Sequence, residues 1–220
     1  MTFSITARCP DTGAFGVAIS SSSIAVASRC AWPDPLGVVT SQNLTNPALG
    51  PAGQRLLRQG LGAKAILSTL LAGDPDPSWR QVAVVDRYGQ VAWHSGTQAF
   101  ADWNVSVGEG VVAMGNLLAS PRITDAMLDA FTSGASLALA ERLMRSLEAG
   151  IAAGGEIQPV RSAGIKVCHQ LDWAVTDLRV DWDEEPISRL REIRDLYAAE
   201  EAAFILRASN PSKAFNQETH

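Results

Sequence analysis

TFSITARCPDTGAFGVAIS, residues 2–20, is the stretch of sequence that decides the fold. Apolar and polar side chains alternate from Thr2 to Arg8, with the two-residue period of a strand that has one apolar face. PDTG at 10–13 then supplies turn residues, and AFGVAIS returns as a second strand over 14–20. The stretch therefore predicts an antiparallel hairpin that starts at Thr2.

The rest of the chain alternates between blocks of strands and blocks of helices. Further strands are expected at 36–42, 80–86, 90–95, 110–114, 162–168 and 174–181. Helices are expected at 51–60, 63–72, 120–134, 136–154 and 186–207. This order favours an α+β architecture, with two mostly antiparallel sheets stacked face to face and helices outside, over a βαβ-wound sheet. We expect a single domain over residues 1–207 and a polar, disordered tail over 208–220.

Charge and composition argue against several classes of protein. The 220-residue chain has a net charge of −5, and its 18 basic residues are scattered. Nucleic acids and anionic membranes require a basic stripe, so we expect neither as a partner. No stretch approaches about 18 continuous apolar residues, and no signal peptide is apparent. Three cysteines far apart in the sequence indicate reduced thiols and a cytoplasmic protein.

Motifs for cofactors and metals are absent from the sequence. It contains no GxGxxG, GxxxxGK[ST], CxxC or HExxH. The three histidines do not have the spacing of a metal cluster, and there is no GxSxG elbow of the α/β-hydrolase type. We therefore expect neither a metal nor a cofactor.

Polar residues gather where two of the predicted strands end. SSSSIAVASRC, residues 20–30, places Ser21 and Ser22 either as hydrogen-bond donors beside a pocket or in an exposed turn. TSQNLTNPALGP, residues 40–51, places Gln42 and Asn43 at a strand-to-helix junction. Such junctions present N–H groups and amides that bind a carbonyl or carboxylate, although helix capping is an equal alternative.

A third junction repeats this pattern in MGNLLASP, residues 114–121. Gly115 permits close approach of another backbone or a positive φ, and Asn116 offers an amide. The alternative interpretation is an ordinary turn from a strand into a helix. Both residues are candidates for substrate binding.

Thr2 supports the most specific hypothesis about chemistry. A threonine hydroxyl is a weak nucleophile unless a base takes its proton, and the free α-amine of the same residue can be that base. An α-amine has a pKa of about 7.7–8.0, so part of it is unprotonated near neutral pH. Removal of Met1 would leave Thr2 at the start of the chain, on a rigid strand. The alternative is that Thr2 is merely the first residue of a strand.

Several blocks of the sequence resemble the DUF1028 family, in order, over about residues 1–195. They are MTFSITARCPDTGAFGVAISSSSIAVASRC, TSQNLTNPALGPAGQRLL, RQVAVVDRYGQVAWHSG, AMGNLLASP, LAERLMRSLEAGIAAGG and DLRVDWDEEPISRLREI. The resemblance implies a four-layer αββα sandwich of the N-terminal-nucleophile (Ntn) hydrolase type. It also matches Thr2 to the threonine that follows the initiator methionine in that family.

Two departures from the family pattern bear on the site. Many relatives carry Ser-Lys where this chain has Ser21-Ser22, so a lysine beside the candidate nucleophile is absent. A block that is commonly GGDxRGxQSA appears here as GGEIQPVRSA, with Glu156 in place of the aspartate. If this block shapes the pocket, the departures imply a changed substrate or a loss of activity.

Three hypotheses for the function remain open. In the first, the protein is an amidohydrolase of a small amide or peptide, in which Thr2 attacks and amides near Asn43 or Asn116 stabilise the oxyanion. In the second, it is a non-catalytic relative that binds a small ligand or serves as an assembly subunit. In the third, the nucleophile lies in the Ser20–Ser23 run or is the thiol of Cys30.

The final predicted helix carries an apolar stripe that bears on assembly. Its members are Ile187, Leu190, Ile193 and Leu196. Such a stripe either packs on the protein's own core, which is the interpretation we prefer, or forms a contact between subunits. We expect a homo-oligomer on general grounds.

Overall fold

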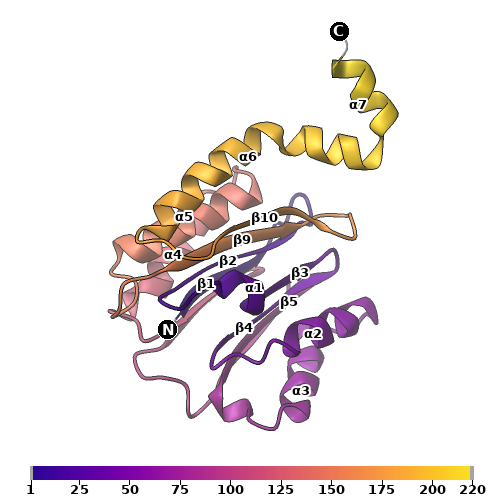
Figure 1. Ribbon diagram of the computed structural model, residues 1–220. Coiled ribbons are helices and arrows are strands. Elements are labelled where there is room, and N and C mark those ends of the chain that lie inside the picture. Colours follow the sequence, from indigo (N-terminus) through magenta and orange to yellow (C-terminus); the bar gives the residue numbers. More distant parts are fainter. Residues whose placement is uncertain (1, 219–220) are drawn as a thin grey trace.

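Two antiparallel sheets stack face to face between two layers of helices (Figure 1). The structure is a computed structural model that describes residues 2–218, and the side chains of residues 2–214. The six-stranded sheet has the order β10 (Ala174–Val180), β9 (Ser162–Cys168), β2 (Phe15–Ser21), β1 (Thr2–Arg8), β8 (Val111–Asn116), β7 (Asn104–Gly108). The four-stranded sheet has the order β3 (Ala31–Asp34), β4 (Gly37–Asn43), β5 (Arg80–Asp86), β6 (Val91–Ser95). The predicted α+β fold with an αββα layer order is confirmed.

The helices divide between the outer faces of the two sheets. Those on the six-stranded sheet are α4 (Arg122–Ser133), α5 (Leu139–Ala152) and α6 (Pro186–Ser209). Those on the four-stranded sheet are α2 (Leu49–Arg58) and α3 (Ala63–Gly73). The remaining helices are the short α1 (Val26–Cys30), a 3-10 turn (Pro77–Trp79) and α7 (Pro211–Glu218). Each sheet therefore buries both of its faces.

The alternation in β1 sets which layer each side chain contacts. Phe3 and Ile5 belong to the core cluster that β1 forms with α4 and α5. Ser4 lies on the opposite face, where its hydroxyl donates a 2.7 Å hydrogen bond to Gln42 Oε1 of the other sheet. The polar face is therefore buried as well, because a second sheet covers it where a one-sided sheet would meet water. Small hydroxyl residues on that face let the two sheets approach.

Three short elements were not expected from the sequence. β3 and β7 are edge strands of their sheets, and β3 contains Pro33, which a strand accommodates best at an edge. α1 lies where a polar strand end was expected, and its entry residue Ala25 has a φ of +53°. Each is too short to show a clear period in the sequence.

The C-terminal segment differs from the expectation of a disordered tail. α6 continues to Ser209 and is followed by α7, which extends beyond the sheets in Figure 1. Asn210 Oδ1 accepts a hydrogen bond from the backbone N–H of Lys213, and Pro211 occupies the first turn, so the sequence contains both signals of a helix start. Residues 219–220 of the predicted tail lie outside the described part of the chain.

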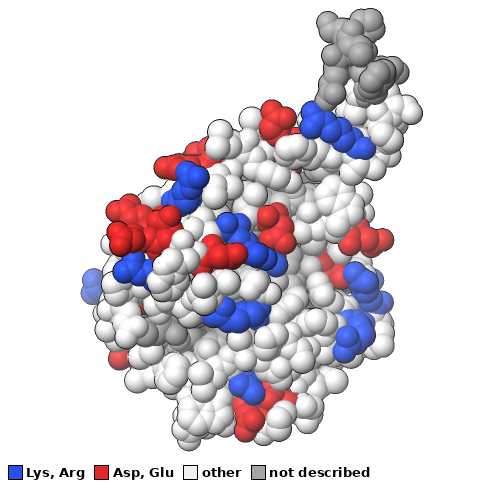
Figure 2. Space-filling view, in the orientation of Figure 1, with Lys and Arg blue, Asp and Glu red and all other residues white. Residues whose placement is uncertain are grey.

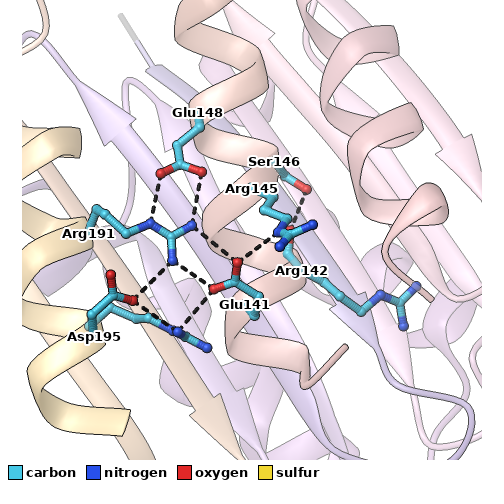
Figure 3. A network of polar contacts seen from close by, with 8 residues as sticks. Glu141, Arg142, Arg145, Ser146, Glu148, Arg191 and Asp195 are labelled. Carbon is cyan, nitrogen blue, oxygen red and sulfur yellow. Dashed lines mark hydrogen bonds and ion pairs between the residues drawn. The ribbon is translucent and has the colours of Figure 1, made fainter. Parts of the chain in front are cut away.

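An ion-pair network fastens α6 to α5 (Figure 3). The guanidinium of Arg191 on α6 binds both carboxylate oxygens of Glu148 on α5, at 2.8 and 2.9 Å, and also Glu141 at 2.7 Å. A planar guanidinium gains most from such two-pronged contacts.

The apolar stripe of α6 packs on the core at Ile187 and Leu190, whereas Leu196 is 75% exposed. The first half of α6 is thus part of the core.

The surface carries both signs of charge. On the face shown in Figure 2, basic and acidic side chains are interspersed over the body of the molecule. No helix among residues 2–218 has the length and apolar character needed to cross a bilayer. These observations agree with the scattered charge of the sequence.

Candidate functional site

Thr2 begins β1 in the middle of the six-stranded sheet. It pairs with Asn116 of β8, and its hydroxyl donates a 3.4 Å hydrogen bond to Ser21 Oγ of β2. Thr2 has the same strand parity as Ser4, so its side chain faces the other sheet. Only 4% of Thr2 is exposed. The structure thus brings together three of the residues selected from the sequence, Thr2, Ser21 and Asn116.

A chain of amides continues the site between the sheets. The side-chain amide oxygen of Gln81 on β5 (Oε1) accepts hydrogen bonds from Asn116 Nδ2 at 2.8 Å and from Gln42 Nε2 at 3.1 Å. Gln81 Nε2 donates in turn to Ser95 Oγ and to the carbonyl oxygen of Gly115. Hydrogen bonds of this kind fix the orientation of each amide in a buried setting. Gln42 and Asn116 are therefore linked through Gln81, which the sequence analysis did not name.

Asn116 retains one polar atom that the protein does not satisfy. Its Oδ1 is buried and has no hydrogen-bond partner among residues 2–214, while its Nδ2 donates to Gln81 Oε1. A buried acceptor without a partner costs about 1–3 kcal/mol, so such atoms mark strain or a binding role. The next residue, Leu117, has a φ of +50°, which is uncommon for a residue other than glycine. The free atom is an acceptor, and it is suited to an N–H group.

The serine turn after β2 forms the other side of the site. Ser21 Oγ and Ser23 Oγ lie 2.9 Å apart, and the guanidinium of Arg29 donates to Ser23 Oγ at 2.6 Å. The backbone N–H of Ser22 donates to Glu156 Oε2 at 3.1 Å. Ser21 is fully buried at the end of β2 and Ser22 begins the turn, so polar contacts close this turn and Ser21 does not lie in an exposed turn.

Glu156 is the carboxyl group of this site. It is 7% exposed, and its second oxygen, Oε1, is buried without a hydrogen-bond partner in the described part of the chain. Burial raises the pKa of this carboxyl from its ordinary 4.5 to about 7. The group can therefore gain or lose a proton near neutral pH.

Asn43 and Gly115 differ in how they relate to the site. The amide of Asn43 donates to the carbonyl oxygen of Trp79 at 2.7 Å and accepts from the N–H of Phe100 at 3.2 Å, so it holds two loops together. A Cβ on Gly115 would lie 2.6 Å from the side chain of Leu118 and 3.1 Å from Thr2 O. Gly115 thus allows close packing beside Thr2, which agrees with the close approach that the sequence indicated.

The site contains residues that sequence analysis did not assign to it. Gln81 carries a signal, since it is the polar residue at the start of an otherwise apolar strand, RQVAVVD. Ser4 carries another, because it follows the alternation that begins with Thr2. The sequence singled out Glu156 only as a departure within the GGEIQPVRSA block, because its place in the site depends on contacts with Ser22 and Leu118, which are distant in the sequence.

Cys30 is the thiol that the sequence offered as an alternative nucleophile. Burial raises the pKa of the Cys30 thiol to about 11, which leaves it protonated near neutral pH and disfavours it as a nucleophile. Among the residues that the structure describes, no three His, Cys, Asp or Glu side chains are grouped as metal ligands.

Comparison with known proteins gives the relationship of the chain. A family model described as "Family of unknown function (DUF1028)" matches residues 2–190. The crystal structure of a Silicibacter pomeroyi protein of that family is similar, with a TM-score of 0.81 and 27% identity over 89% of this chain and 88% of that one. No curated protein matches. The chain therefore belongs to the DUF1028 family.

Proposed function

We propose that the protein is an N-terminal-nucleophile-type amidohydrolase that acts on a small amide or peptide. The observation that carries the proposal is the position of Thr2, whose hydroxyl lies on the first residue of β1 and faces the space between the sheets beside Ser21 and Asn116. The αββα layer order is the one implied by resemblance to Ntn hydrolases. Cleavage of the Met1–Thr2 bond would provide the free amine that the mechanism requires.

The reaction proceeds in two halves. Thr2 Oγ1 attacks the substrate carbonyl carbon as the Thr2 α-amine takes the hydroxyl proton, which gives a tetrahedral oxyanion. The ammonium then donates that proton to the leaving nitrogen, the C–N bond breaks, and an ester to Thr2 remains. Water adds to this ester with the amine again as base, and the acid product leaves as Oγ1 regains its proton. No redox partner is needed.

Polar groups around Thr2 have separate roles in this reaction. The buried Oδ1 of Asn116 can accept an N–H of the substrate or of the amine. The amide chain of Gln42 and Gln81 holds Asn116 in place. Asn116 Nδ2, the candidate oxyanion donor, also donates to Gln81 Oε1. In other enzymes one positioned oxyanion donor is worth about 2.7–4 kcal/mol in the transition state.

The burial of the site supports a second candidate function. Thr2 is 4% exposed and Asn116 is fully buried, so a substrate reaches them only after the edge of the site opens. A relative without catalytic activity that serves as an assembly subunit, or that binds a small ligand elsewhere, needs no such opening.

The experiment compares the wild type with Thr2→Ala and Thr2→Ser, each checked by intact mass for removal of Met1. A panel of N-acyl p-nitroanilides and dipeptides supplies the amide bonds. We expect hydrolysis by the wild type, a rate at least about 10³-fold lower for Thr2→Ala, and partial activity for Thr2→Ser, which retains a hydroxyl. Equal rates for wild type and Thr2→Ala would refute the proposal, and ligand-induced stabilisation without turnover would favour the binding function.

Location and assembly complete the proposal. Cys9, Cys30 and Cys168 are all free and buried, which fits a reducing compartment such as the cytoplasm.

The exposed Leu196 and Phe204 on the projecting half of α6 make this half the proposed contact between copies in a homo-oligomer. Light scattering of the wild type and of a Leu196→Glu variant tests this contact between copies. A monomeric mass for both proteins would refute it.

A further inference from the structure

Residues 155–157 lie beyond the start of β1, between the continuations of its two neighbouring strands. Glu156 forms an antiparallel bridge with Leu118, two residues past the end of β8. Its side chain accepts the N–H of Ser22, the residue that follows the end of β2. Since β1 lies between β2 and β8 and starts at Thr2, Glu156 spans the place where β1 would continue upstream.

One oxygen of the Glu156 carboxyl is available to accept a hydrogen bond beyond the start of β1. Oε2 is held by Ser22, whereas Oε1 is buried and has no hydrogen-bond partner among the residues that the structure describes. The residue is 7% exposed, so water is largely excluded from it. A buried carboxyl oxygen in this state favours a hydrogen-bond donor that arrives from a ligand or from the chain itself.

We infer that Glu156 is the positioning residue for the α-amine of Thr2, and that Oε1 accepts a hydrogen bond from this amine once the Met1–Thr2 bond is cleaved. The inference rests on the proposed function. Cleavage at that bond creates the amine on the upstream side of Thr2, where Glu156 lies between the two neighbouring strands. The amine is a donor in both its neutral and its protonated form, so the contact persists through the reaction.

The contact between Glu156 and the Thr2 amine would assist proton transfer, and Glu156 would neither gain nor lose a proton overall. As the amine takes the hydroxyl proton of Thr2 it becomes an ammonium, and the carboxyl oxygen then accepts a charge-assisted hydrogen bond. The ammonium returns the proton to the leaving nitrogen, and Glu156 ends as it began. Glu156 contacts neither the substrate carbonyl nor the leaving group in this scheme.

The charged side chain nearest in sequence to Ser22 is Arg29. Arg29 donates to Ser23 Oγ and to the carbonyl oxygen of Ile24. The side chains of Leu118 on the continuation of β8 and of Ser22 after β2 carry no charge. The titration of the amine is therefore expected to respond mainly to Glu156, with Arg29 as a constant background.

The test measures the titration of the Thr2 amine directly, without turnover. Periodate oxidises an N-terminal threonine only when its amine is free and unprotonated, so the rate against pH gives the midpoint of the amine. Protein that starts at Thr2 is prepared as wild type, Glu156→Gln, Glu156→Asp and the exposed control Glu200→Gln, and the reaction is followed by intact mass. Thermal unfolding confirms that each variant is folded.

We expect the amine midpoint of Glu156→Gln to fall by about one pH unit, because a nearby carboxylate favours the ammonium form. Glu156→Asp keeps the charge and should retain most of the wild-type midpoint, and Glu200→Gln should leave it unchanged. If Glu156→Gln does not fold, the wild-type midpoint should still exceed that of the same protein in urea. Equal amine midpoints for wild type and Glu156→Gln would overturn the inference, and so would equal midpoints for folded wild type and wild type in urea.

The same samples distinguish failure of this inference from failure of the proposed function. Hydrolysis that depends on Thr2, together with an unshifted midpoint, would refute the role of Glu156 and leave the hydrolase in place. A shifted midpoint without hydrolysis would support the contact and refute the catalytic proposal.

Discussion

Glu156 makes the stability of the protein depend on pH in a direction opposite to that of most carboxylates. Burial raises its folded-state pKa from 4.5 to about 7, so the folded chain favours the protonated carboxyl. The stabilisation is complete below pH 4.5 and is lost as the pH rises through about 7. Because one pKa unit corresponds to about 1.4 kcal/mol, the wild type should lose roughly 2–3 kcal/mol between pH 5 and pH 8 from this group.

Glu156→Gln removes this dependence, since the amide stays neutral and similar in size. Urea unfolding of the full chain at pH 5, 6, 7 and 8 gives the free energy of unfolding of wild type, Glu156→Gln and the control Glu200→Gln. We expect the difference between Glu156→Gln and wild type to change by roughly 2–3 kcal/mol in favour of the variant across this range. A constant difference at all four pH values would show that the carboxyl titrates normally, and would refute the reasoning.

Three further substitutions test the packing and polar contacts. Gly50→Ala places a Cβ 1.9 Å from the ring of Trp32, so urea unfolding should show a loss of about 1–3 kcal/mol, whereas Gly73→Ala, with open space around it, should be nearly neutral. Gln81→Leu leaves two buried amides without their acceptor and should cost about 1–3 kcal/mol; an unchanged stability would contradict the amide chain. Arg191→Met should cost roughly 1–2 kcal/mol and speed hydrogen exchange in α6, and unchanged exchange there would count against the network.

Most of the fold could be predicted from local patterns, because the long elements have clear periods. The strands over 2–8 and 162–168 agree with β1 and β9 at both ends. β3 was missed because it has only four residues and contains Pro33, and β7 was missed because its five residues are too few to show a clear period. α7 was missed although Asn210 and Pro211 mark its start, because its polar composition was taken as a sign of disorder.

The candidate site was predicted only in part, for a physical reason. Thr2, Ser21 and Asn116 meet because neighbouring strands place them at one level, which a correct strand order implies. Glu156 reaches the site through a bridge outside the named strands. Asn43 looks the same in the sequence as Asn116, and only the loops at Trp79 and Phe100 show that its amide holds them together. Contacts between distant segments decide such roles.

The most direct test of the central claim is the site of acylation by a small β-lactone on protein that starts at Thr2. Opening of the lactone by a nucleophilic hydroxyl leaves an ester, which intact mass and peptide mapping locate. The account predicts a single adduct on Thr2 in the wild type, none in Thr2→Ala, and none in wild type that retains Met1. A free Thr2 amine with no adduct, or an adduct on Ser21 or Cys30 that persists in Thr2→Ala, would contradict it.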